Sequence, residues 1–400
     1  MIGIIIAGAV FLSDYVTESV LSINVWDIPT DGLADTVLAG EPQEAFDSIT
    51  VLPLDNTITG IPLWAVHSSG MVNWDTNPMT DHFLAIFTWE DSTWIELDRI
   101  TMVDESIDYM FSDGVKQEFI TDDFIWLAVE GGIGAHSGAY ELLTFDGKYL
   151  DIRFSSSHCR PGFAWLENLP ADSLTDLLLD YSDPYVFFYA SGVIKPDIRI
   201  QRWDSRSTEM VAMNLRKLPP ATEYSLREPV NRAVEFAEAG LWLQAFTAIG
   251  EVLPLPDTVS DPERWIIVWN ETLISQNLET GEGSVEGGYP LLGYVFYGDY
   301  QASIDIMRQY APEEIFCVES PLIQGTVAQG WETELSGYLI SCTESALEVE
   351  PECAAAFYLH GWALYLSEQS ISQIIDDVQK AVRFDPSEPL YALSLEYLTE

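Results

Sequence analysis

The sequence predicts an α+β protein in which the two kinds of element form separate domains, an N-terminal all-β domain and a C-terminal array of α-helical hairpins. In residues 40–215, apolar residues alternate in short runs that Gly, Asp, Asn and Ser interrupt, which is typical of β-strands. In residues 225–400, Ala, Leu and Glu recur at helical spacing over long stretches. Residues 216–224 contain a Pro-Pro pair, so we expect the linker between the domains there.

The composition limits what the chain can be and what it can bind. With 400 residues, 48% of them hydrophobic, the chain can bury a core in each domain, which excludes a disordered or fibrous protein. The 64 acidic and 17 basic residues give a formal net charge of −47, which repels phosphate backbones and excludes nucleic-acid binding. Direct binding to anionic membrane surfaces is disfavoured for the same reason. The acidity favours solubility or salt tolerance over a dedicated role in attracting cations.

Residues 1–12 form an unbroken apolar run. The run is shorter than the roughly 20 apolar residues that span a bilayer, and it has no positively charged leader. It is therefore either the back half of an export segment whose basic start is missing or a buried β-strand. We expect a secreted or otherwise extracytoplasmic protein, anchored to a membrane only through a longer N-terminus, and a cytoplasmic location stays open.

The four cysteines do not form a metal-binding pattern. Cys159, Cys317, Cys342 and Cys353 are widely spaced, and no pair has the two-residue gap of a zinc knuckle. We therefore expect no zinc site built on cysteine. A disulfide between Cys342 and Cys353 stays open for an oxidising compartment.

The β half contains one turn pattern three times. An aromatic residue precedes an acidic residue at Trp89, Phe145 and Trp203, and these aromatic residues are 56 and 58 positions apart. An aromatic side chain that packs inward and an acid that accepts hydrogen bonds from turn amides are typical of a β-hairpin. A period of this size holds about four strands, as in one propeller blade, with residues 49–54 and 62–66 as a partial fourth unit. A compact β-sandwich is the alternative.

Within this half, residues 168–180 resemble the calcium loop of FG-GAP and VCBS-type propeller repeats. That family places oxygen ligands at alternating loop positions with glycines between them. Asn168, Asp172 and Asp176 stand at the first, third and last of the ligand positions, whereas Pro170 stands at the second, and the glycines are absent. Calcium requires six to eight oxygen ligands. The resemblance implies either a calcium-stabilised adhesive module or a turn that has kept its shape and lost its ion.

The helical half repeats a second pattern. The segments from Ala346 to Pro351 and from Ala381 to Pro386 share an Ala-x-x-x-x-Pro ending and are 35 residues apart, with the small residue Gly361 between them. Small residues allow two helices to approach closely, and proline ends the second helix. The period and the ending resemble tetratricopeptide repeats, which run at about 34 residues.

Two earlier segments repeat the turn of this pattern. Gly240, Trp242 and Ala245 occupy its glycine, aromatic and alanine positions, and Gly298 and Tyr300 do so again with serine in place of alanine. The resemblance implies an array of helical hairpins whose concave groove holds a peptide or protein segment.

Three other segments carry local expectations. Residues 185–189 have the pattern of a β-strand, and residues 265–269 that of an isolated helix. Residues 280–288 are rich in glycine, which predicts an exposed loop.

A glycine-rich segment, residues 131–134, lies just before His136 and Ser137. One interpretation is a ligand-contact loop, in which the glycines cradle an anion and His136 and Ser137 contact the ligand. A phosphate-binding loop, however, leads from a strand into a helix, and the residues that follow Ser137 have a strand pattern. The sequence therefore favours a connection between two strands.

The sequence carries no nucleophile elbow, zinc-binding helix motif or P-loop. We therefore expect a non-enzymatic protein-binding or scaffold protein, with no cofactor other than calcium, whose partner is a protein or peptide segment in the helical groove. The alternative is a hydrolase or carbohydrate-acting enzyme with an acidic cleft in the β domain. That cleft would be lined by some of the tryptophans that otherwise form the core of the domain, Trp64, Trp74, Trp89, Trp94 and Trp126.

Overall fold

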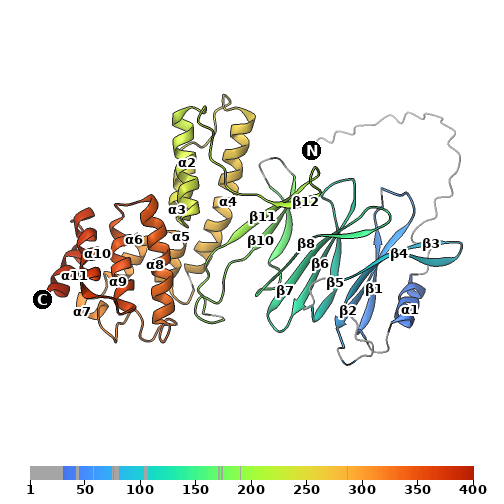
Figure 1. Cartoon of the computed structure of the whole chain (residues 1–400), viewed down its shortest axis with the longest axis horizontal. Coiled ribbons are helices and arrows are strands. Elements are labelled where there is room, and N and C mark those ends of the chain that lie inside the picture. The colour runs from blue at the N-terminus through green and yellow to red at the C-terminus, as the bar shows by residue number, and fades with distance from the viewer. Residues whose placement is uncertain are drawn as a thin grey trace, which may run out of the picture.

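The strands and helices are segregated along the chain as the sequence predicts (Figure 1). The computed structural model describes residues 30–41, 45–56, 58–73, 75, 81–102, 107–169, 172, 174–189, 191–285 and 287–400. Residues 1–12 and Trp74 lie outside these ranges. Within the described residues, the short helix α1 (Asp31–Gly40) comes first, the strands lie between Ser48 and Ala212, and the further helices lie between Tyr224 and Thr399.

The β domain is a series of antiparallel four-strand meanders, β1–β4, β5–β8 and β9–β12. The first two meanders join in one curled sheet, because the last residues of β2, Gly70 and Met71, pair with Met110 and Tyr109 of β5. The strands are β1 (Ser48–Leu54), β2 (Leu63–Met71), β3 (Phe83–Glu90), β4 (Thr93–Thr101), β5 (Tyr109–Glu118), β6 (Ile125–Ile133), β7 (Ser137–Phe145), β8 (Leu150–His158), β9 (Ala164–Asn168), β10 (Thr175–Asp180), β11 (Ile198–Asp204) and β12 (Glu209–Ala212).

Each of the predicted turns joins the third and fourth strands of a meander. In the β7–β8 turn, Asp146 Oδ1 accepts hydrogen bonds from the amides of Lys148 and Tyr149, at 2.8 and 2.7 Å. In the β11–β12 turn, Asp204 Oδ1 accepts one from the amide of Arg206 at 3.0 Å. The repeat period therefore predicted the correct four-strand unit. Residues 49–54 and 62–66 are not a partial fourth unit, because they contribute β1 and β2 of the first meander. The interpretation as separate blades is wrong for the first two units, because the β2–β5 pairing makes them continuous.

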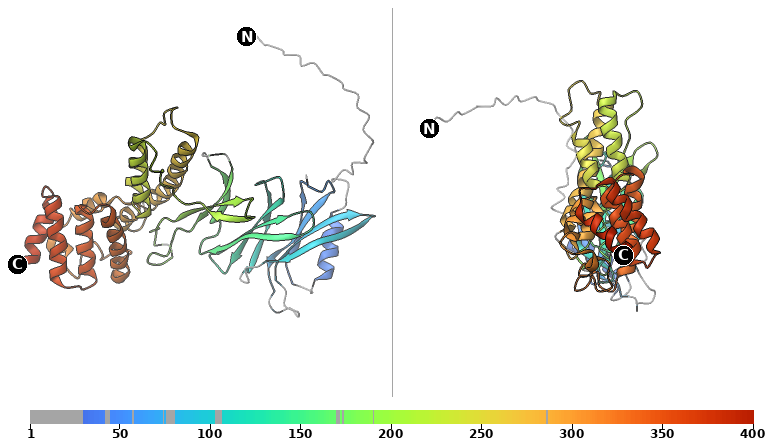
Figure 2. Two further views of the ribbon diagram at one scale, coloured as in Figure 1. Left: turned by 45° about the horizontal axis from the view of Figure 1, so that its top comes forward. Right: turned by 90° about the vertical axis from the view of Figure 1, so that its left-hand side faces the viewer.

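Apolar side chains on alternate faces of the strands create a stack of layers, since successive side chains of a strand point to opposite faces. Figures 1 and 2 show the layers along the long axis of the molecule, with α1 at one end and the helical array at the other. In the first layer, Leu33 of α1 packs with Trp64 and Phe83. The second layer is the inner face of the curled sheet, which buries Leu63, Leu84 and Leu127. The third lies between the second and third meanders and contains Trp126, Leu142 and Leu177, and in the fourth Leu178 and Ile200 pack on Trp269 of helix α4.

The C-terminal domain is an array of helices in which sequence neighbours pack as hairpins (Figure 1). Its core is continuous from Val186 in the segment before the linker to Tyr391 in the last helix. The helices are α2 (Tyr224–Glu238), α3 (Trp242–Gly250), α4 (Asp261–Val285), α5 (Pro290–Tyr297), α6 (Tyr300–Met307), α7 (Pro312–Ile315), α8 (Glu332–Val349), α9 (Ala354–Leu366), α10 (Ile371–Phe384) and α11 (Pro389–Thr399).

The glycine positions of the helical pattern lie in turns or helix contacts. Gly240 and Gly298 end α2 and α5 in the left-handed region, with φ of 77° and 97°, which glycine adopts without steric cost. Gly361 lies in α9, where an added Cβ would be 3.3 Å from Cγ2 of Val378 in α10. These residues allow the tight turns and the close packing that a helical hairpin needs.

The other pattern residues lie where the sequence places them. Ala245, Ala346 and Ala381 are fully buried between helices. Trp242 and Tyr300 begin α3 and α6, and Pro351 and Pro386 lie just beyond the ends of α8 and α10.

Three local expectations are wrong. Residues 265–269 are not an isolated helix, because they form the first part of the long helix α4. Most of residues 280–288 also belongs to α4, which continues to Val285; Gly281 lies where an added Cβ would be 2.6 Å from the Cβ of Tyr297. Residues 185–189 form no strand, because they bury Val186 and Phe187 in the helical core instead.

In the described part of the chain, no helix is both long and apolar enough to cross a membrane. All four cysteines are free thiols, Cys342 and Cys353 among them.

Candidate binding groove

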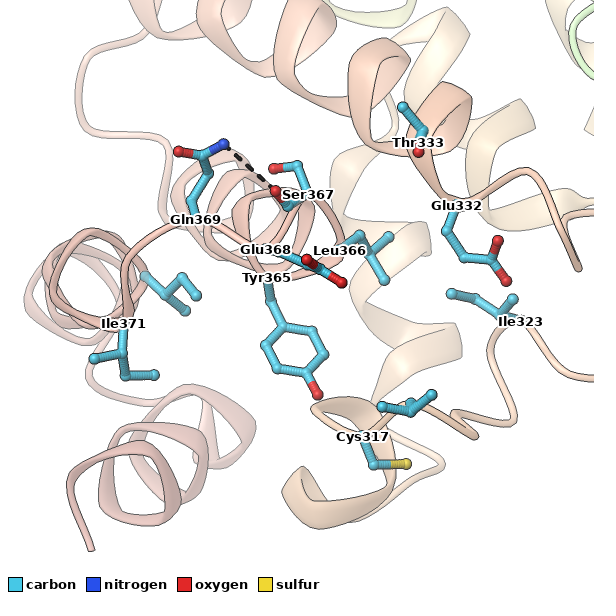
Figure 3. Close-up of a pocket in the computed structure, with 12 residues that line it drawn as sticks. Cys317, Ile323, Glu332, Thr333, Tyr365, Leu366, Ser367, Glu368, Gln369 and Ile371 are labelled. Carbon is cyan, nitrogen blue, oxygen red and sulfur yellow. Dashed lines mark hydrogen bonds between the residues drawn. The ribbon is translucent and has the colours of Figure 1, made fainter.

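An open groove of about 750 Å³ lies in the helical array. The helices that form it, α7 to α10, lie at the end of the molecule opposite α1 (Figure 1). Its walls come from the loop between α7 and α8, the first turn of α8, and the turn between α9 and α10 (Figure 3). The volume is in the range of pockets that hold small ligands or large side chains. The groove is lined by Cys317, Val318, Ile323, Glu332, Thr333, Tyr365, Leu366, Ser367, Glu368, Gln369, Ile371 and Ile374.

The groove combines a buried apolar floor with an exposed apolar rim. Ile323 and Ile374 are each 2% exposed. The ring of Tyr365 is directed toward Cys317 in Figure 3 and packs against the ring of Phe316, with the centroids 5.4 Å apart. Val318 is 89% exposed and Ile371 is 53% exposed on the rim. Exposed apolar side chains beside a concave apolar surface are typical of a binding site.

The charges of the groove are all negative among the described residues that line it. Glu332 and Glu368 are acidic, and no lysine, arginine or histidine lines the same space. Glu332 lies in the first turn of α8, where Oε1 accepts a hydrogen bond from the amide of Gly330 at 3.1 Å. Glu368 follows α9 and has a φ of 56°. Burial raises the pKa of Tyr365, so this hydroxyl stays neutral at physiological pH.

A second hollow, of about 560 Å³, crosses α8, α9 and α10 and contains a histidine–carboxylate pair. His360 Nδ1 lies 2.7 Å from Asp377 Oδ2, and Lys380 Nζ lies 3.1 Å from Asp377 Oδ1. Nε2 of His360 is buried and has no hydrogen-bond partner. A nucleophile hydrogen-bonded to this nitrogen would be needed for a catalytic triad. Ser372 lines the hollow but forms no hydrogen bond with His360 in the structure.

The structure brings two of the three predicted calcium ligands together, around an arginine. Arg202 of β11 binds both oxygens of Asp176, with Nε and Nη2 each at 2.6 Å, and its Nη1 lies 2.6 Å from Asp172 Oδ2. Asn168 Oδ1 instead accepts a hydrogen bond from Thr175 Oγ1 at 2.7 Å. The guanidinium therefore supplies the positive charge at these carboxylates. In the described residues, no group of three or more His, Cys, Asp or Glu side chains could hold a metal ion.

This arginine cluster joins the β domain to the helical domain. Trp265 of α4 donates a hydrogen bond from Nε1 to Asp172 Oδ2 at 2.8 Å, and its ring stacks on Trp269 with the centroids 5.7 Å apart. Burial raises the pKa of Asp176, and the hydrogen bonds from Arg202 only partly oppose this effect. Burial acts in the same direction on Asp172, but there the hydrogen bonds from Arg202 and Trp265 outweigh it and lower the pKa.

His136 and Ser137 lie at the turn between β6 and β7, so the glycine-rich segment connects two strands, as the sequence favours. Ser137 pairs with Ile133 across the turn. The exposed ring of His136 stacks on Tyr189, with the centroids 4.7 Å apart and the planes at 22°. The ring of His136 thus belongs to a contact between this hairpin and the segment before the linker.

The tryptophans of the β domain pack mainly on one another and on the core. Trp64 and Trp126 are fully buried. Trp94 contacts both Trp64 and Trp89, with ring centroids 4.9 and 4.8 Å apart. Buried rings cannot stack on a sugar, so Trp64 and Trp126 give the carbohydrate-acting alternative no support.

Sequence reasoning missed two features of these sites. Arg202 is 26 and 30 residues from the carboxylates that it binds, and no motif links them. The residues of the groove are spread from Cys317 to Ile374, and no motif marks them either. The one signal that bears on the groove is the charge distribution along this part of the chain.

Together these features define a two-domain protein in which a layered β domain is joined through an arginine cluster to an array of helical hairpins with an open, acidic groove. No known protein-family model matches this chain, and no curated protein is detectably similar to it in sequence. The likeness to FG-GAP and tetratricopeptide repeats therefore rests on the motifs described above.

Proposed function

We propose that this protein is a non-enzymatic binding or scaffold protein that holds a segment of another protein in the groove between the α7–α8 loop and the α9–α10 turn. The observation that carries the proposal is the open groove, which mixes polar and apolar lining residues and has the exposed apolar side chains Val318 and Ile371 on its rim. Burying such side chains against a partner is favourable by about 25 cal/mol per Å² of apolar surface.

The tetratricopeptide-like pattern supports the same function, since arrays of this kind present grooves to extended or helical segments. In this proposal the β domain, with its FG-GAP-like loop, is an accessory module that the arginine cluster fixes to the array. We also propose an extracytoplasmic location, which rests on the apolar run of residues 1–12 and the acidic composition.

A photo-reactive amino acid placed at Ile371 tests this function. In cells that express the full chain, it should form specific protein adducts, because its position is on the rim of the groove. The matched control carries the same amino acid at Phe119, which follows β5 and is 69% exposed. The substitution Val318→Asp should reduce the adducts formed at Ile371. Adducts that are equal at both positions, or that persist in Val318→Asp, would show that the groove is not the binding site.

A further inference from the structure

The groove lies in a part of the chain that carries negative charge alone. Between Arg308 and Lys380 the sequence contains 12 aspartates and glutamates and not one lysine or arginine. This stretch includes α7, α8, α9 and the first part of α10, and it supplies every residue that lines the groove.

The two cations at the ends of this stretch are already paired. Arg308 lies 2.7 Å from Asp305 and 2.6 Å from Glu388. Lys380 lies 2.7 Å from Asp376 and 3.1 Å from Asp377. Neither cation is therefore available to neutralise the carboxylates of the groove.

We infer, on the basis of the proposed function, that the partner segment is basic: lysine or arginine side chains flank one or two large apolar side chains. The apolar side chains pack on Tyr365, Leu366 and Ile323, and the cations lie beside Glu332 and Glu368. Charge complementarity selects this occupant, because an acidic segment would meet like charges with no cation to relieve them.

Two other possible occupants, a metal ion and a second copy of this chain, fit the groove less well. A metal ion gains nothing from the apolar floor, and among the described residues only two carboxylates line the space. A second copy of this chain brings the same net charge of −47 and is repelled. A basic segment with an apolar anchor uses both properties of the groove.

The expected strength of the charge effect follows from its exposure. Ion pairs at a surface are weak and are screened over about 8 Å at physiological salt. The apolar contacts therefore supply most of the affinity, whereas the carboxylates speed association and discriminate between partners. Removing both carboxylates should weaken binding about three- to tenfold, as expected for two exposed ion pairs.

Selection from a displayed library of short random peptides tests the inference. The full chain and its Ile371→Asn variant, which removes the apolar side chain without adding a charge, are each immobilised at physiological salt, and the net charge of peptides enriched only on the wild type is compared with that of the library. Enrichment of basic peptides with apolar side chains supports the inference. Enrichment of neutral or acidic peptides that Ile371→Asn abolishes would overturn it and leave the proposed function standing. If no enriched peptide depends on Ile371, both proposals fail.

A matched pair of variants then tests the two carboxylates. Fluorescence anisotropy of a synthetic Lys/Leu peptide is measured with the wild type, with Glu332→Gln/Glu368→Gln, and with the control Glu396→Gln on α11. The double variant should bind more weakly and lose part of the salt dependence, whereas the control should match the wild type. A Glu/Leu peptide of the same length should not bind. Equal binding of both peptides, or no effect of the double variant, would overturn the role of charge.

Discussion

Replacing Arg202 by methionine should strongly destabilise the interface between the two domains. The side chain of Asp176 is fully buried, and among the described residues only Arg202 binds its two oxygens, each at 2.6 Å. Methionine keeps much of the apolar stem but leaves this carboxylate buried without a counter-charge. Breaking a buried ion pair from one side costs about 3–5 kcal/mol. Protonation of Asp176 relieves part of this cost, so the loss should be smaller at lower pH.

Urea unfolding followed by tryptophan fluorescence measures this loss, because Trp265 and Trp269 lie next to the guanidinium. The matched control is Arg199→Met on the same strand. Arg199 is 60% exposed and pairs with Asp197, which is 39% exposed, so its loss should cost less than about 1 kcal/mol.

The variant Arg202→Met/Asp176→Leu adds a second comparison. It removes both charges and should recover most of the stability, because well-packed apolar residues can replace a buried ion pair at little cost. The assignment of Arg202 as the residue that stabilises this interface is wrong if Arg202→Met lowers the free energy of unfolding no more than Arg199→Met does. It is also wrong if the double variant is as unstable as Arg202→Met.

Acidification should destabilise the β domain through His67 and His82, because burial lowers the pKa of both imidazoles, to about 4 for His82. The pKa of each imidazole in the folded state lies below its unfolded value of about 6.5, so the neutral imidazoles contribute their full stability above pH 6.5 and lose it as the pH falls toward 4. For His82 the free energy of unfolding should fall by at most about 1.4 kcal/mol per pH unit. Urea unfolding across this range should give a shallower loss for His82→Asn than for wild type. Equal slopes in the two proteins would contradict this origin. Thermal unfolding with calcium and then with chelator should give the same midpoint temperature, because Arg202 already binds the carboxylates of Asp172 and Asp176. A rise of several degrees with calcium would contradict this expectation and make Asp172 the first residue to substitute.

The sequence predicted those parts of the fold that depend on local rules. Turn acids such as Asp146 and Asp204 bind amides two or three residues away, and Gly298 ends its own helix, so each leaves a signature in a short segment. The four-strand period follows from the spacing of such turns, and the expected linker follows from the Pro-Pro pair in residues 216–224. These features need no knowledge of distant contacts.

The features that depend on distant contacts were missed or misjudged. Gly281 weakens a helix by propensity, yet it belongs to α4 because Tyr297 packs on it from another helix. Residues around Phe187 have a strand pattern, yet tertiary packing draws Phe187 into the helical core. The Asp172 and Asp176 carboxylates look like calcium ligands until Arg202 from β11 is placed between them.

The layered order of the molecule also decides how proteolytic damage would spread. α1 covers only the outer face of the first meander, and the groove lies at the opposite end, beyond the third meander and α4. Each layer is held by its immediate neighbours, as in repeat proteins. A cut that releases α1 therefore uncovers Trp64 and Phe83 but removes no contact of the groove. Trimming from that end shortens the molecule and leaves a fragment that still contains the groove.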